Sequence, residues 1–297
     1  MNRLRTNQGA LVMMSVMGMI APPLRRGAYR IDREGVPFSL PGTGGITYNV
    51  KLGDSAFGWA GDHVEPCVST AAVSDMNRSD TRNQGYNMLA CIGNSCQVVS
   101  GDAKGAKGMV TGTHGGIEHV IMDFPDQDIE KMCIEDKIMI KAYGQGLKLL
   151  DYPGITVYNV DPRLLDVMGL KDKGGRLVIP VTHTVPGKLM GSGLGSPDTA
   201  TGDYDITTSD QDEISRLGLA QLRFGDLVAL EDSDNRFGRS YRSGAISIGV
   251  VVHSDCLLAG HGPGVTTLFT AIDGSIDIVK DPHANIGEIL KIGRFRA

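Results

Sequence analysis

Short apolar runs, each ended by residues that favour turns, dominate the pattern of this chain. The runs are rich in Val, Ile and Met, and Gly, Pro, Asp or Asn stand at their ends, which is typical of β-strands. We expect strands at residues 11–20, 28–32, 46–51, 87–92, 96–100, 108–112, 118–123, 137–142, 155–160, 176–182, 226–230, 245–253, 266–272 and 276–280. The pattern predicts a mainly β protein.

Helical signals are few and short. Pro162 can open a helix that stops before Gly169, and Ser209 can cap another that stops at Gly218. We expect short helices at residues 126–132, 161–167, 209–217 and 285–292. Because strands do not alternate with long helices, a doubly wound parallel sheet is disfavoured.

Residues 96–143 look like a separate unit within this β pattern. Strands alternate there with glycine turns, and the unit resembles the small SH3-like barrels of translation proteins. Its G-x-x-K-G-x-x-G turn is not a P-loop, because the G-K-[ST] ending and a following long helix are missing. We expect a layered β-sandwich body formed by residues 1–95 and 144–297, an inserted SH3-like small barrel at 96–143, and a functional site carried by the C-terminal segment.

Composition narrows the class of protein. The chain has 297 residues, and its 40 glycines are about twice the usual share of roughly 7%, which suggests many tight turns. A net charge of −5 argues against a dedicated nucleic-acid binder. The five cysteines are irregularly spaced without a C-x-x-C pair, which favours a reduced, cytoplasmic setting.

The N-terminal region resembles a signal peptide, since Arg3 and Arg5 precede an apolar run over residues 10–21. The run lacks an A-x-A cleavage site, and it is too short to span a membrane as a helix. We therefore interpret it as a buried strand, and we expect no membrane partner.

The most informative stretch is residues 244–264. A strand ends there on His253, Asp255 follows, and His261 stands in a glycine turn before Gly262. Glycines beside a histidine let the backbone approach a ligand closely. Asp255 is placed to orient an imidazole. This stretch predicts the floor of a site.

Two earlier regions offer further ligands. In the first, Gly44 lies in a glycine loop whose N–H groups can face an anion, and Asp62, His63 and Glu65 follow. These side chains suit a metal ion, or they are surface groups bonded to backbone. In the second, the carboxylates of Asp203 and Asp205 share a face if the strand is regular, or they lie in a solvated turn.

Other residues complete the candidate set. Gly193 belongs to a glycine-rich flap or backbone cradle, and Gln145 stands between two glycines. Arg236 and Arg239 can recognise a carboxylate. His114 and His119, on either side of the glycine turn in the predicted barrel, are interpreted as plain loop and strand residues. Cys256, which follows Asp255, is interpreted as a packed thiol.

Long segments of the chain resemble the prokaryotic family called domain of unknown function 4438. They are LPGTGGITYNVKLGDSAFGWAGDHVEPCVS, VVSGDAKGAKGMVTGTHGGIEHV, KAYGQGLKLLDYP, LMGSGLGS, GDYDITTSD and GVVVHSDCLLAGHGPGV. The resemblance covers nearly the whole chain. It implies a mainly β, multi-domain fold with a small SH3-like barrel and no established activity. In that family the position of Cys67 is usually glycine, so this thiol is a local feature.

A looser analogy gives the functional hypothesis. The glycine-rich Asp segments and the His-Gly-x-Gly turn are similar to the acetamidase and formamidase fold. We expect a metal-assisted hydrolase of a small amide or related carbonyl substrate, using Zn, Mg, Mn or Ca. The metal ligands would be Asp62, His63, Asp203, Asp205 and His253. The catalytic residues would be Glu65, Asp255 and His261, with Glu65 or Asp255 as general base. The ligand-binding residues would be Gly44, Gly193, Gln145, Arg236, Arg239 and Gly262.

Two alternatives remain open. The barrel could dock RNA or a protein, with Lys104, Lys107 and His114 contacting phosphate, although the acidic balance and 5% aromatic content count against base stacking. The same pocket could also bind a small molecule without turnover. We further expect a homo-oligomer, with the site at a subunit seam.

Overall fold

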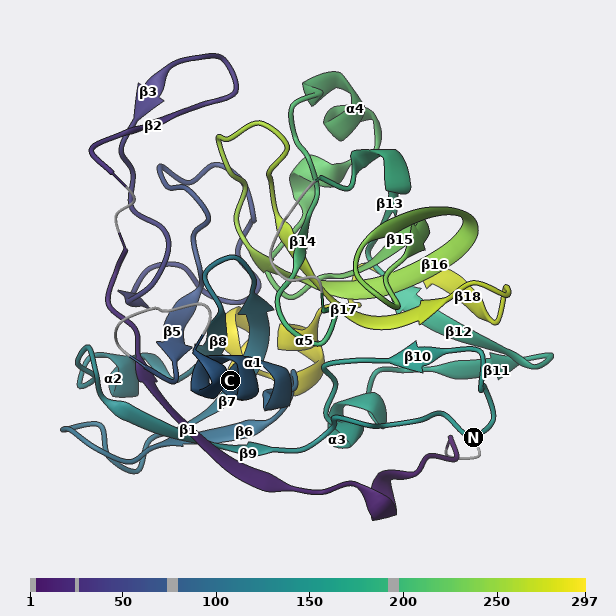
Figure 1. Cartoon of the computed structure of the whole chain (residues 1–297), viewed down its shortest axis with the longest axis horizontal. Helices are drawn as coiled ribbons and strands as arrows, with labels where there is room; N and C mark the ends of the chain where they lie inside the picture. Colours follow the sequence, from purple (N-terminus) through teal and green to yellow (C-terminus); the bar gives the residue numbers. More distant parts are fainter. Residues whose placement is uncertain (1–3, 25–26, 74–79, 192–197) are drawn as a thin grey trace.

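The computed structural model describes residues 4–24, 27–73, 80–191 and 198–297 (Figure 1). Strands predominate and the helices are short, which confirms the mainly β prediction. The helices are α1 (Thr81–Leu89), α2 (Asp126–Ile129), α3 (Pro162–Leu165), α4 (Gln211–Arg216) and α5 (Ile286–Leu290). Single 3-10 turns occupy Gln8–Ala10, Gly187–Leu189, Leu219–Gln221 and Gly293–Phe295. No helix of the described residues is long and apolar enough to cross a bilayer.

Six antiparallel strands close into a small barrel in the order β1-β9-β6-β7-β8-β5, and β5 pairs back with β1. Their bounds are β1 (Met14–Ile20), β5 (Cys67–Ala71), β6 (Ser95–Val98), β7 (Lys107–His114), β8 (His119–Asp123) and β9 (Lys137–Ala142). A short strand, β4 (Ile46–Thr47), extends the sheet beyond β5. Closure pairs the strand edges within the ring. Two of the barrel strands, β1 and β5, come before residue 95 and so lie outside the predicted unit 96–143. The predicted domain boundaries stay a prediction.

A second, six-stranded sheet lies beside the barrel, on the right in Figure 1. It has the order β10-β17-β16-β15-β13, and β14 also pairs with β17. The bounds are β10 (Thr156–Val157), β13 (His183–Pro186), β14 (Tyr204–Asp205), β15 (Leu227–Asp234), β16 (Ser240–His253) and β17 (Gly264–Ala271). Smaller pairings join β11 (Lys171–Lys173), β12 (Arg176–Val181) and β18 (Ile276–Lys280), and β2 (Arg30–Ile31) with β3 (Pro37–Phe38).

The barrel meets the second sheet where β7 packs against β16 and β17. Gly112 permits this contact, because a Cβ there would lie 2.3 Å from Val252 Cγ1. Next to it, Thr113 N–H donates to Thr266 Oγ1 at 3.3 Å, and that hydroxyl donates to the Thr113 carbonyl at 3.0 Å. The ends of β7 and β16 are thereby held side by side.

Two predictions about local structure are wrong. Residues 87–89 end helix α1 instead of beginning a strand, because Asp80 caps the helix and its buried Asn87 donates to the Glu118 carbonyl. The expectation that residues 10–21 form a buried strand fails for its first half. Met14 and Met17 on β1 are about half exposed, and only the end of β1 enters the core.

Strand β5 was not predicted, because all five of its residues are buried and no polar alternation marks it. Its first residue, Cys67, has a φ of +67°, in the left-handed region that favours glycine. Glycine could adopt this backbone conformation without the steric cost that a side chain carries.

Helix α1 offers a test of local stability at Gly85. Nothing lies within 4 Å of where a Cβ would stand, and the φ of Gly85 is outside the left-handed region. We expect Gly85→Ala to stabilise the protein by about 0.5–1 kcal/mol in urea unfolding, since alanine loses less entropy in a helix. The matched control is Gly218→Ala, which has equal space but a φ of +70° and should destabilise instead. Equal effects of the two would contradict this reasoning.

Candidate functional site

Four histidine rings from separate segments meet where the barrel abuts the second sheet. His114 ends β7, His253 ends β16, and His63 and His261 lie in loops. The ring centroids of His114 and His253 are 4.2 Å apart, and those of His63 and His253 are 5.1 Å apart. The centroid of the His261 ring lies 5.3 Å from that of His63. Rings this close cannot all be protonated at once unless anions lie among them, and as neutral imidazoles they can bind a metal ion.

The first triad of possible metal ligands is His114, Asp203 and His253, all buried, with one donor atom of each within 4.8 Å of the others. His253 Nε2 and Asp203 Oδ2 are 2.8 Å apart, which is an ion-pair distance when the ring is protonated. Neither atom has a hydrogen-bond partner among the described residues. Because buried polar atoms are rarely left unsatisfied, this pair fits two ligands that face a common cation.

The remaining polar atoms of the first triad are fixed by the protein. Glu65 Oε1 accepts from His114 Nδ1 at 2.6 Å, and the Ser254 carbonyl accepts from His253 Nδ1 at 2.9 Å. With the proton on Nδ1, each ring leaves Nε2 free to bind a metal ion. The Gly115 N–H donates to Asp203 Oδ1 at 2.7 Å, so one carboxylate oxygen is also left.

Gly264 makes room for these atoms. A Cβ at that position would lie 1.8 Å from Asp203 Oδ2 and 2.2 Å from His253 Nε2. Any other residue would therefore occupy the space toward which both unsatisfied atoms point. The orphaned atoms, the fixed tautomers and this cradle all fit a divalent cation.

Glu65 is fully buried, and its carboxylate accepts hydrogen bonds that fix the histidines of the site. Besides His114 it accepts from His119 Nδ1 at 2.9 Å, from Ser69 Oγ at 2.6 Å and from the Gly44 N–H at 2.7 Å. Burial alone would raise the pKa of its carboxyl, but His119 and His114 outweigh burial and hold that pKa well below its usual value. The Gly44 N–H, which was expected to face a bound anion, is occupied by this protein carboxylate, and the ligand-binding role of Gly44 stays a prediction.

The second triad is His63, Cys256 and His261, also within 4.8 Å of one another. His63 Nδ1 lies 3.3 Å from Asp62 Oδ2, and Arg30 donates to the same oxygen at 2.7 Å. His63 Nε2 faces His261 Nδ1 at 3.4 Å. The His261 side chain is 30% exposed, whereas the first triad is buried, so solvent reaches the site from the His261 side.

Asp205 lies between the two triads. Its Oδ1 is 3.5 Å from His253 Nε2, and its Oδ2 is 2.8 Å from His261 Nδ1. Burial alone would lower the pKa of His253, but Asp203 and Asp205 hold it well above the usual value. Burial lowers the pKa of His63 to about 4. The surroundings therefore shift the pKa values of these two neighbouring rings in opposite directions.

Most predicted ligands do meet in this cluster. The predicted metal ligands and catalytic residues that lie in the cluster are Asp62, His63, Glu65, Asp203, Asp205, His253 and His261. Asp255 lies beside Cys256, and its carboxylate accepts from Thr208 Oγ1 at 2.6 Å and does not contact His253. Gly262 packs its backbone against Ile206, where a Cβ would lie 1.8 Å from the carbonyl oxygen.

Other predicted ligand-binding residues have partners elsewhere. Gln145 donates to the Met88 carbonyl, Arg236 pairs with Asp234, and Arg239 donates to the Met190 carbonyl. Gly193 lies outside the described residues. Their ligand-binding roles stay predictions.

Three members of the cluster were not singled out from the sequence as ligands, namely His114, His119 and Cys256. His114 and His119 face each other as a register pair across the β7–β8 hairpin. Two histidines that bracket a glycine turn between two strands are the signal that could have found them.

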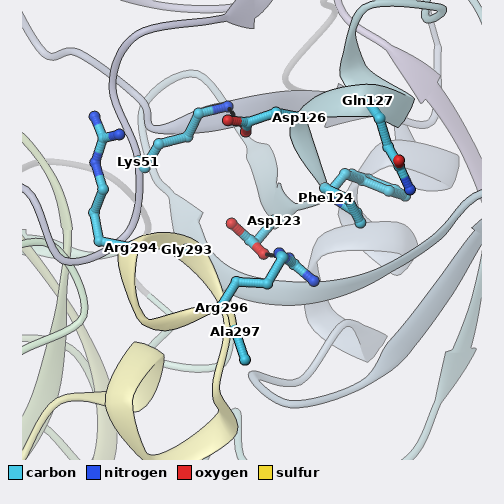
Figure 2. Close-up of a pocket in the computed structure, with 10 residues that line it drawn as sticks. Lys51, Asp123, Phe124, Asp126, Gln127, Gly293, Arg294, Arg296 and Ala297 are labelled. Atoms are coloured by element: carbon cyan, nitrogen blue, oxygen red, sulfur yellow. Dashed lines mark hydrogen bonds and ion pairs between the residues drawn. The ribbon is translucent and has the colours of Figure 1, made fainter.

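A separate cavity of about 480 Å³ lies under the C-terminal segment. Figure 2 shows the Asp123 carboxylate between Arg296 and the pair formed by Lys51 and Asp126. Burial raises the pKa of Asp123, partly offset by Arg296. None of the lining residues belongs to the histidine cluster. The Arg296–Asp123 ion pair joins the C-terminal segment to β8 of the barrel, and the Lys51–Asp126 pair joins a loop to α2.

Comparison with known proteins identifies the family. Two family models, each described as a domain of unknown function (DUF4438), match the chain: the N-terminal one at residues 29–166 and the C-terminal one at residues 167–290. A solved structure titled "Crystal structure of TM1086" is similar to this chain at 48% identity and a TM-score of 0.91, covering 97% of this chain and 99% of that one. The comparison with curated proteins returns no match. The chain belongs to the DUF4438 family, as its sequence motifs predicted.

Proposed function

We propose that this protein is a metal-dependent hydrolase that acts on a small amide or a related carbonyl compound. The observation that carries the proposal is the buried triad of His114, Asp203 and His253, in which Nε2 of His253 and Oδ2 of Asp203 are unsatisfied at 2.8 Å. Two imidazoles and a carboxylate are ligands of catalytic zinc sites, which keep a position open for water or substrate.

In this proposal, different residues bind the ion, orient its ligands and meet the substrate. His114, Asp203 and His253 would hold a divalent ion, and Glu65 and the Ser254 carbonyl fix the ring orientations of the two histidines. When bound, a divalent ion polarises a carbonyl and lowers the pKa of water. Because solvent reaches the cluster at His261, an incoming substrate meets that side chain first. Imidazole ligands favour zinc over magnesium, manganese or calcium in this role.

The contacts favour Asp255 over Glu65 as general base. Glu65 is closed in by four donors, whereas Asp255 is partly exposed and burial raises the pKa of its carboxyl toward the range useful for proton transfer. We expect Asp255→Asn to keep the full metal content and to lower kcat by about 10²–10⁴-fold. Loss of metal from this variant, or unchanged kcat, would exclude the role.

RNA docking through the barrel is weaker as a second function. His114, one of the three residues expected to contact phosphate, is buried and donates to Glu65. A small-molecule carrier would use the same pocket, and only turnover separates it from the enzyme.

The direct test is to strip the protein with a chelator, restore zinc or manganese, and assay a panel of small amides and esters. We expect hydrolysis that requires the restored ion. His183→Ala is the matched control, since this histidine contacts Thr182 outside the cluster and should change nothing. A panel without turnover and a protein that takes up no ion would refute the proposal.

The pKa shifts also predict how pH affects the stability of the metal-free protein. Unfolded histidines bind a proton below a pH of about 6.5, but folded His63 does not until about 4, so stability falls between these values by an amount on the order of 3 kcal/mol. His253 acts in the opposite direction. Its contribution is complete below about 6.5 and is lost as pH rises through its raised folded pKa.

We therefore expect urea unfolding of the metal-free protein to give a stability maximum near neutral pH with losses on both sides. With the ion bound, the loss at high pH should disappear, because the ion takes the place of the His253 proton. An identical alkaline profile with and without metal would contradict this assignment.

A further inference from the structure

We propose that the site binds two metal ions, with the Asp205 carboxylate bridging them. This rests on the proposed function, which requires only the ion at His114, Asp203 and His253. The second ion would lie at His63, Cys256 and His261. The two triads share no residue, so their six donor atoms form two separate sets.

The position of Asp205 is the first argument. Its Oδ1 faces the first triad, 3.5 Å from His253 Nε2. Its Oδ2 faces the second triad, 2.8 Å from His261 Nδ1 and 4.0 Å from His63 Nε2. A carboxylate that turns one oxygen to each ligand set is the arrangement that holds two cations about 3.5–4 Å apart.

The second argument is the support behind the second triad. Asp62 accepts from His63 Nδ1 and leaves Nε2 toward His261, which repeats the relation of Glu65 to His114. His63 holds this position at a φ of +54°, an uncommon conformation for a residue with a side chain. Strained backbone of this kind concentrates at functional sites.

Charge gives the third argument. Four carboxylates are buried together here, those of Asp62, Glu65, Asp203 and Asp205. Arg30 balances one of them at Asp62, and a first divalent ion offsets two more. A second divalent ion offsets the remaining carboxylate together with the Cys256 thiolate that would bind it.

The two positions differ in chemistry and in access. The first is buried and offers imidazole and carboxylate ligands. The second adds the Cys256 sulfur, a soft ligand that selects zinc over magnesium or calcium, and it lies on the side of the exposed His261. We infer that the ion at Cys256 exchanges faster and is the one nearer to the substrate.

Cobalt(II) tests this without any assay of activity. The stripped wild-type chain is titrated with cobalt(II), and bound metal is measured by elemental analysis. We expect two ions per chain, and with the second a near-ultraviolet absorption from sulfur-to-cobalt charge transfer. Cys256→Ser should keep one ion and lose that absorption. Cys133→Ser is the matched control, since its exposed thiol lies outside both triads and should behave as wild type.

A second variant guards against a folding defect. His261→Ala lies at the open side and should also keep one ion, with an unchanged circular dichroism spectrum. One ion in the wild type, or two ions without the sulfur absorption, overturns the two-ion site and leaves the proposed hydrolase intact. No bound ion in the wild type overturns both.

Discussion

Replacing His253 by Ala should remove the ion of the first triad and lower kcat by about 10³-fold or more. Its Nε2 is a fully buried nitrogen without a hydrogen-bond partner, 2.8 Å from Asp203 Oδ2, and alanine has no atom that could bind the ion. An ion that polarises a carbonyl contributes several kcal/mol to the transition state, and each 1.36 kcal/mol is about tenfold in rate. Elemental analysis beside the amide and ester assay measures both effects.

His253→Gln provides the companion variant, because its amide oxygen can partly replace the ligand atom. We expect it to recover some metal at high ion concentration while Ala does not. Equal metal content in wild type and His253→Ala would rule out the first triad as the ion's location.

Replacing Glu65 by Gln should have the largest effect on stability, about 3–5 kcal/mol, and should weaken metal binding about 10–100-fold. An amide has only one acceptor oxygen for the donors that surround Glu65. If its NH2 group faces His114 Nδ1, the ring must move its proton to Nε2, and that nitrogen can no longer bind an ion. Urea unfolding and a metal titration of the same variant test the two effects.

Ser69→Ala is the control for Glu65, since it removes a single donor to Oε2. We expect a loss of about 1 kcal/mol and normal metal content. If Glu65→Gln is no worse than Ser69→Ala, the carboxylate does not hold the histidines in place.

Local patterns predicted the parts of the site that are local. His261 is marked by its glycines, Asp203 and Asp205 by their spacing, and His63 by its acidic neighbours. His114 and His119 were interpreted as plain strand residues, because their meaning depends on Glu65, which approaches from a loop about 50 residues earlier. Pairings of that range leave no trace in hydrophobic periodicity.

The fold shows the same division. The strands from β6 to β9 and from β15 to β18 lie close to their predicted places, because apolar runs bounded by turn residues mark them. Helix α1 was missed because Gly85, Asn83 and Asn87 all have low helix propensity. In the structure, Asn83 accepts from the Ala72 N–H and Asn87 donates to the Glu118 carbonyl. Barrel closure could not be predicted, since it depends on β1 pairing with both β5 and β9.

The ligands of the first triad come from both family domains, with His114 in the N-terminal domain and Asp203 and His253 in the C-terminal one. An ion held there fastens one half of the chain to the other. Binding of this kind adds to the free energy of unfolding in proportion to the logarithm of free ion concentration, about 2.7 kcal/mol at a hundred times Kd. A protein stabilised in this way would resist proteases for longer when free metal is plentiful. Its abundance would therefore rise and fall with the concentration of that metal.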